Sequence, residues 1–337
     1  MVAPPPKSTS PRPTPPFMFS SLRIQWIEPC RARCVRCGTW PKNPVFRDMI
    51  AAGADVSAHA FYLEAARTFK PQSLYVSGGE PLLSDALPVA LRGFSEAVTG
   101  QTFLFSSFQF SDAERELALA RDWPQDRVSL THTVIAMDPG TWATETGGFP
   151  FDLYLRNLRE LGGRFARKRI KFILNHEDVA GQVDRFLEAV RPDDSWVFSL
   201  KLVNLQGGAL QADVIEATRQ RALDRIATRT GLFGLHPAWQ TDVTGEETLA
   251  GLAAGGDVAA CPWRTAPREL RFAVRAFSDD RVRLYYRFCP FFPADRHFGF
   301  HVGHDAMDQI RLAYEKHKWH SWCPDCRLRR YCAPSHP

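Results

Sequence analysis

The sequence lacks several features that would place it in common functional classes. No stretch approaches about eighteen uninterrupted apolar residues, so no transmembrane helix and no membrane partner are predicted. The amino terminus has no apolar core of a signal peptide, which predicts a cytoplasmic protein. Basic and acidic residues nearly balance, 42 against 37, so composition gives little reason to expect nucleic acid as a partner. No internal repeat is present.

The composition is that of a folded protein with room for more than one domain. The chain has 337 residues, 45% of them apolar and 23% charged. Residues 1–16 are rich in Pro, Ser and Thr and are predicted to form a disordered tail. We expect a main domain over residues 17–232 and a smaller domain over residues 233–337, because the sequence pattern changes after Gly231.

Strand-like and helix-like stretches alternate through the main domain. The predicted strands are Phe17–Ile27, Ser73–Gly78, Thr102–Phe108, Val128–Asp138, Arg169–Asn175 and Trp196–Leu205. The predicted helices are Val56–Phe69, Ser111–Asp122, Phe151–Gly163, Glu177–Val190 and Gln211–Gly231. Six strands that alternate with helices predict an α/β fold with a parallel sheet, and eight strand–helix units would close a barrel. We therefore expect a partial (β/α)6 TIM-like barrel, with functional groups at the carboxyl ends of its strands.

The last quarter of the chain follows another pattern. Two strand-like runs flank Ser278-Asp279-Asp280 and predict a β-hairpin, and a helix is predicted from Asp305 to Lys316. The segment with His297, His301 and His304 is interpreted as a solvated loop, with a metal site or polar pocket as the alternative. The fold would then end in a small hairpin-and-helix extension.

Three of the eight cysteines lie close together near the amino terminus. Cys30, Cys34 and Cys37 form the pattern C-x3-C-x2-C on the loop after the first predicted strand. In a reducing compartment, closely spaced cysteines are more commonly metal ligands than disulfide partners. Three thiolates can hold three irons of a [4Fe–4S] cluster and leave the fourth iron open to another ligand. A zinc ion with a distant fourth ligand is the alternative.

A second motif follows the next strand. Ser77-Gly78-Gly79-Glu80 ends the run SLYV, where two glycines allow a ligand to approach the backbone and Glu80 adds an acceptor for an ammonium group. Alone, this sequence is also typical of an ordinary turn.

The two motifs, in this order and spacing, resemble the radical S-adenosylmethionine (SAM) superfamily. The resemblance implies that the open iron binds SAM, that the Ser77–Glu80 motif and the strand-end residues Asp138 and Asn175 contact it, and that a flavodoxin or ferredoxin supplies electrons. SAM would then be cleaved to a 5′-deoxyadenosyl radical that abstracts hydrogen from a substrate carbon. Arg36 stands where the family usually has an aromatic residue, and Ala136 where relatives carry a serine.

The other five cysteines resemble the SPASM and twitch extensions of that family, which carry auxiliary [4Fe–4S] clusters. The run C-x2-C-x5-C matches the SPASM pattern, but His336 stands at its fourth position. The resemblance implies at least one auxiliary cluster on Cys261, Cys289, Cys323 and Cys326, with Cys332 as a spare ligand or a hydrogen donor to the substrate. A second, ligand-poor cluster on Cys332 and His336, or one zinc ion, is the alternative.

These features predict an enzyme that oxidises or epimerises a small polar metabolite, such as an aminocyclitol, sugar or nucleoside, in natural-product biosynthesis. The alternative within the family is a maturase that modifies a peptide or protein; the short amino-terminal segment, with no room for a leader-binding domain, favours the metabolite. A non-catalytic iron–sulfur or zinc protein is the hypothesis from another class, and it predicts no affinity for SAM.

Overall fold

A computed structural model of the chain describes residues 21–26, 34, 54–173, 178–192, 196–201, 269–276, 282–287, 298–301 and 307–310, with helical backbone at six single positions between residues 217 and 228. Within these ranges, no helix combines the length and the apolar character needed to cross a bilayer. The predicted tail and the boundary between the two predicted domains lie outside the described residues and stay predictions.

Nine described strands form one sheet in the order β6-β5-β4-β3-β2-β1-β7-β8-β9. The strands are β1 (Ser21–Trp26), β2 (Ser73–Gly78), β3 (Gln101–Ser106), β4 (Val128–Val134), β5 (Arg167–Ile173), β6 (Trp196–Lys201), β7 (Glu269–Ala276), β8 (Val282–Arg287) and β9 (Phe298–His301). Strands β1 to β6 are parallel neighbours, and the sheet does not close on itself. The fold is the α/β partial TIM-like barrel that the sequence predicts.

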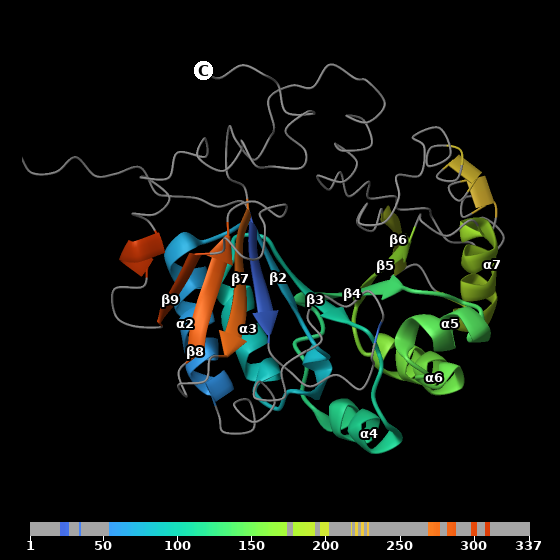
Figure 1. Cartoon of the computed structure of the whole chain (residues 1–337), viewed down its shortest axis with the longest axis horizontal. Helices are drawn as coiled ribbons and strands as arrows, with labels where there is room; N and C mark the ends of the chain where they lie inside the picture. Colours follow the sequence, from blue (N-terminus) through green and yellow to red (C-terminus); the bar gives the residue numbers. More distant parts are fainter. Residues whose placement is uncertain are drawn as a thin grey trace, which may run out of the picture.

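Helices follow the parallel strands along the chain (Figure 1). They are α2 (Ala54–Phe69), the short 3-10 helix η1 (Pro81–Leu83), α3 (Leu87–Ala97), α4 (Asp112–Ala120), α5 (Pro139–Thr146), α6 (Phe151–Gly162) and α7 (Val179–Val190). In Figure 1, α2 and α3 lie towards the end of the sheet that carries the orange strands β7, β8 and β9, and α5, α6 and α7 lie towards its green end.

The two faces of the sheet differ in what covers them. Along β1, the side chains of Leu22, Ile24 and Trp26 are fully buried, while those between them are half-buried. The Trp26 ring stacks on His59 of α2 and meets Phe94 of α3 edge-on. The Leu22 side of the sheet therefore packs on the helices, and the Arg23 side faces away from them.

Helix α4 begins where the sequence predicts, with a capping box. The hydroxyl of Ser111 accepts a hydrogen bond from the backbone N–H of Glu114, whose carboxylate accepts the N–H of Ser111 at 2.8 Å. Each bond satisfies a donor at the start of the helix that would otherwise have no partner.

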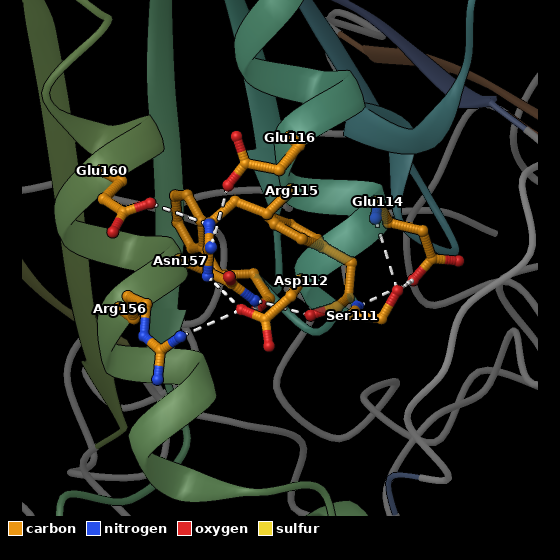
Figure 2. A network of polar contacts seen from close by, with 10 residues as sticks. Ser111, Asp112, Glu114, Arg115, Glu116, Arg156, Asn157 and Glu160 are labelled. Atoms are coloured by element: carbon orange, nitrogen blue, oxygen red, sulfur yellow. Dashed lines mark hydrogen bonds and ion pairs between the residues drawn. The ribbon is translucent and has the colours of Figure 1, made fainter.

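Ion pairs fix α4 against α6, as Figure 2 shows. The side chain of Arg115 is 8% exposed, and its Nε lies 2.8 Å from Glu160 on α6. Asp112 accepts from Arg115 at 2.5 Å and from Arg156 of α6 at 3.0 Å. This network holds α6 in place, and with it Asn157, which reaches the site described below.

Most predicted elements of the main domain are present with shifted ends. The strand predicted to run to Asp138 ends at Val134, because Pro139 begins helix α5 with Asp138 as its cap. Helices α3 and α5 were not predicted. The helix predicted over Gln211–Gly231 is represented by the six single helical positions.

The predicted hairpin is confirmed as β7 and β8, which pair antiparallel. Its place was not predicted, since β7 pairs parallel with β1 and so extends the main sheet. The expected loop around His301 is wrong for residues 298–301, which form β9. Residues 307–310 are helical, within the predicted Asp305–Lys316 helix.

Candidate functional site

The glycine pair of the second motif ends β2, in the middle of the sheet. A Cβ atom on Gly78 would lie 1.5 Å from the carbonyl oxygen of Trp26 on β1, so no other residue fits there. The hydroxyl of Ser77 donates to the carbonyl of Ile24 at 3.2 Å. Both contacts hold the start of the motif against β1, at the carboxyl ends of the parallel strands.

Glu80 is fully buried and accepts five hydrogen bonds. Oε1 accepts from the Ser106 hydroxyl at 2.8 Å and from the N–H of Leu82 at 3.3 Å. Oε2 accepts from the N–H and the hydroxyl of Ser107, at 2.8 and 2.6 Å, and from the N–H of Phe108 at 2.9 Å. Burial raises the pKa of Glu80, and the hydrogen bonds from Ser107 and Ser106 oppose that rise.

These contacts give Glu80 a definite structural role. A carboxylate offers about four lone-pair positions, and five protein donors already use them. Glu80 therefore fixes the turn after Gly79 to the end of β3. The sequence suggested that Glu80 accepts a hydrogen bond from an ammonium group of the ligand. In the structure, its carboxylate oxygens accept instead from Ser106, Ser107, Phe108 and Leu82.

Residues 106–110, which begin at the last residue of β3, form the centre of the site. Phe108 is fully buried with a φ of 58°, a left-handed conformation that is uncommon for a bulky residue. The side-chain amide of Asn157 on α6 donates to the carbonyls of Phe108 and Phe110, at 2.9 and 2.8 Å. Together with Glu80, this amide compensates the cost of holding the strained residue.

The same segment contacts the first cysteine motif. Gln109 is fully buried, and its Oε1 accepts from the Sγ of Cys34 at 3.7 Å. Its Nε2 is buried and has no hydrogen-bond partner among the described residues. Within residues 106–110, Gln109 thus contacts Cys34, and the three residues before it bind Glu80. The structure therefore brings Cys34 of the first motif and Glu80 of the second to the same segment at one end of the sheet.

A buried histidine supports this segment from the helix side. His132 of β4 makes one ring contact to the carbonyl of Ser106 at 2.9 Å and another to the hydroxyl of Tyr154 at 2.8 Å. A carbonyl only accepts, so Nδ1 carries the proton and Nε2 accepts from Tyr154. Burial lowers the pKa of His132 to about 4 and raises that of Tyr154. The ring is therefore neutral at pH 7.

The folded protein is expected to lose stability as pH falls from about 6.5 to about 4 because His132 must stay neutral in the folded state. The unfolded chain takes up the proton near pH 6.5, whereas the folded chain takes it up near pH 4. The free energy of unfolding should fall by about 3 kcal/mol across this range. Urea unfolding of the metal-free chain at pH 7 and pH 4.5 measures the loss. H132Q should be less stable at pH 7, and its free energy of unfolding should change less between pH 7 and pH 4.5. The same pH dependence in H132Q and the unchanged protein would contradict the conclusion that His132 causes the loss.

The remaining predicted SAM contacts are placed as follows. Asp138 follows β4 and caps α5, with Oδ1 accepting the N–H of Thr141 at 2.8 Å. That hydrogen bond lowers the pKa of Asp138, which is exposed. Asn175 lies outside the described residues, two positions beyond the end of β5. Their part in SAM binding stays a prediction.

Of the eight cysteines, only Cys34 is described. The other predicted metal ligands lie outside the described residues: Cys30, Cys37, Cys261, Cys289, Cys323, Cys326 and Cys332. The sequence analysis missed Gln109, Asn157 and His132. The position of Gln109 just after a parallel strand was a usable signal, whereas Asn157 and His132 reach the site only through tertiary packing.

Comparison with known proteins shows a similarity of fold. No family model and no curated protein matches the chain. The crystal structure of Streptococcus suis SuiB bound to S-adenosylmethionine is similar, with a TM-score of 0.58 and 13% identity over 94% of this chain and 70% of that chain. The chain has the fold of SuiB. Coproporphyrinogen III oxidase (HemN) from Escherichia coli, a radical SAM enzyme, overlaps with a TM-score of 0.39 and 13% identity over 64% of this chain and 53% of its own, too low to carry weight.

Proposed function

We propose that this protein is a radical SAM enzyme that oxidises or epimerises a small polar metabolite. The observation that carries the proposal is the buried segment 106–110, which contacts Cys34 of the cysteine motif and Glu80 of the Gly-Gly-Glu motif. The fold of SuiB, a protein that binds SAM, supports it. Cys34 and Glu80 both contact residues at or just after the carboxyl end of β3, and the carboxyl ends of the strands are where barrel enzymes place their active sites.

The residues around Cys34 fit an iron–sulfur cluster. A cluster-bound cysteine is a thiolate and accepts hydrogen bonds. Turning the Gln109 amide by 180° exchanges its oxygen and nitrogen, and Nε2 then donates to Cys34 Sγ and is no longer without a partner. In our proposal Cys30, Cys34 and Cys37 hold a [4Fe–4S] cluster that supplies one electron for reductive cleavage of SAM.

The described residues around the motif have supporting roles in this proposal. Gly78 lets β1 approach the end of β2 closely, and in our proposal the backbone of the following residue, Gly79, is where SAM approaches the turn. Glu80 holds their turn rigid, so little conformational entropy is lost when SAM binds. The proposal has three further parts. The carboxyl-terminal cysteines hold an auxiliary cluster, and Cys332 is a hydrogen donor to the substrate. A flavodoxin or ferredoxin supplies the electrons.

The proposal is tested on anaerobically reconstituted protein by measuring iron per chain and 5′-deoxyadenosine formed from SAM with a reductant. About eight irons with 5′-deoxyadenosine are expected, since each cubane contributes about four. About four irons per chain with formation of 5′-deoxyadenosine would show that the carboxyl-terminal cysteines hold no iron–sulfur cluster. Zinc in place of iron, without 5′-deoxyadenosine, would refute the proposal and favour the non-catalytic binding protein.

Gln109 is expected to tune the first cluster. In Q109L the sulfur of Cys34 loses a buried N–H donor, and such donors stabilise the reduced form of a cluster. The reduction potential should fall by on the order of 50 mV, with iron content unchanged. Redox titration followed by electron paramagnetic resonance measures the shift. Q101L, at the opposite end of β3, is the matched control and should keep the potential; equal potentials in both variants would contradict the role of Gln109.

A further inference from the structure

One side chain holds the backbone on both sides of Gln109. Asn157 of α6 is fully buried, and its Nδ2 donates to the carbonyl of Phe108 at 2.9 Å and to that of Phe110 at 2.8 Å. Gln109 stands between these two residues, and its own side chain is fully buried and contacts the Sγ of Cys34 at 3.7 Å. Asn157 therefore fixes the stretch of backbone from which the Gln109 side chain extends.

The two carbonyl partners also decide which way the Asn157 amide points. A carbonyl only accepts, so the amide atom that faces both carbonyls is the nitrogen, which carries two N–H donors. The other amide atom, Oδ1, is buried and has no hydrogen-bond partner in the described part of the chain. Among the described residues, both donors of this side chain thus serve the segment that contains Gln109.

The contact with Cys34 is too weak to hold Gln109 in place by itself. The net free energy of one hydrogen bond is no larger than the entropy lost when a glutamine side chain and one residue of backbone become ordered. Phe108 adds a cost of its own, because a φ of 58° is uncommon for a bulky residue. Gln109 therefore depends on contacts to its neighbours, and Asn157 makes two of them.

Asn157 belongs to a helix that is itself held in place. Its neighbours on α6 make the ion pairs of Figure 2, in which Glu160 lies 2.8 Å from Arg115 and Arg156 lies 3.0 Å from Asp112 of α4. A functional group carried by such a helix is positioned more precisely than one on a loop. Helix α6 is therefore a fixed support for the segment that follows β3.

We propose that Asn157 is a positioning residue that sets the reduction potential of the first cluster by holding Gln109 against the sulfur of Cys34. The inference rests on the proposed function, in which Cys34 binds the cluster and the Gln109 amide donates to its sulfur. Such donors stabilise the reduced form of a cluster, and a hydrogen bond weakens steeply when it is misaligned. Releasing the carbonyls of Phe108 and Phe110 should therefore lower the potential, although Asn157 acts on the cluster only through Gln109.

The experiment is a redox titration of anaerobically reconstituted full-length protein, followed by electron paramagnetic resonance. The signal that is absent from C34A belongs to the first cluster. In N157L the ratio of reduced to oxidised first cluster at a fixed potential should fall about 5-fold, a shift of about 40 mV at 59 mV per tenfold change. Iron content should stay the same. N157S, whose hydroxyl is too short to reach both carbonyls, should give the same shift and replaces N157L where that variant does not fold.

Two further variants separate positioning from a general loosening of the fold. Because Asn157 acts through Gln109, N157L should shift the potential of the unchanged protein but not that of Q109L. L158A is the matched control, since Leu158 is the next residue of α6 and its apolar side chain is 1% exposed in the core. It should lose stability in urea unfolding of the metal-free chain and keep the potential.

Several results would overturn the proposal. They are equal potentials in N157L and the unchanged protein, an equal fall in L158A, and an undiminished fall when N157L is added to Q109L. Loss of the first cluster's iron from both N157L and N157S would also overturn it, because the role of Asn157 would then be structural. Unchanged protein without iron would overturn this proposal and the proposed function together. The potentials do not require SAM cleavage, so protein with iron but without 5′-deoxyadenosine would contradict the proposed function alone.

Discussion

Replacing Cys34 by alanine is expected to reduce formation of 5′-deoxyadenosine from SAM to background. Three cysteines are the minimum for the first cluster, and Cys34 is the one that the structure places in contact with Gln109, next to the residues that bind Glu80. Without the cluster there is no electron for SAM. The variant should lose about four irons per chain and keep those of the carboxyl-terminal cysteines. Iron analysis and chromatographic detection of 5′-deoxyadenosine measure both effects.

C332A is the matched control for this variant. If Cys332 is a hydrogen donor to the substrate, its loss should leave SAM cleavage and the first cluster intact. Continued cleavage of SAM by C34A would show that the first cluster is wrongly assigned.

Glu80→Gln is expected to be nearly as damaging, although it changes one atom of the side chain. Backbone N–H groups point at both carboxylate oxygens, those of Ser107 and Phe108 at Oε2 and that of Leu82 at Oε1. An amide nitrogen in either position places donor against donor in a fully buried site. The free energy of unfolding should fall by roughly 2 to 4 kcal/mol. Urea unfolding measures this loss.

The affinity for SAM should fall with it. A loosened turn leaves Gly78 and Gly79 without a fixed position, so we expect at least a 10-fold rise in Kd, about 1.4 kcal/mol. E114Q makes the same chemical change at the start of α4, where glutamine also completes a capping box. It should lose only the favourable charge, about 0.3 to 1 kcal/mol of stability, without changing SAM affinity. Equal SAM affinity in E80Q and the unchanged protein would contradict the role given to Glu80.

The sequence was most informative where chemistry and spacing are local. The first strand and the helix that begins at Ser111 follow from neighbouring residues, and both predictions are confirmed. The approach of Cys34 to Gln109 spans 75 residues and depends on how the loop after β1 meets the end of β3. No local pattern predicts such a contact, and the same holds for Asn157.

The order of the strands shows a second limit. The parallel pairing of β7 with β1 was equally out of reach, because it joins distant parts of the chain.

That pairing also fixes the order in which the protein can be completed on the ribosome. About 240 residues separate the end of β1 from the start of β7. At a synthesis rate of roughly 5 to 20 residues per second, β7 is made on the order of 10 to 50 s after β1. During that time one edge of the nascent sheet has backbone groups that can pair with another chain. Slower synthesis lengthens this interval, so the yield of folded protein should depend on translation speed and on how crowded the nascent chains are.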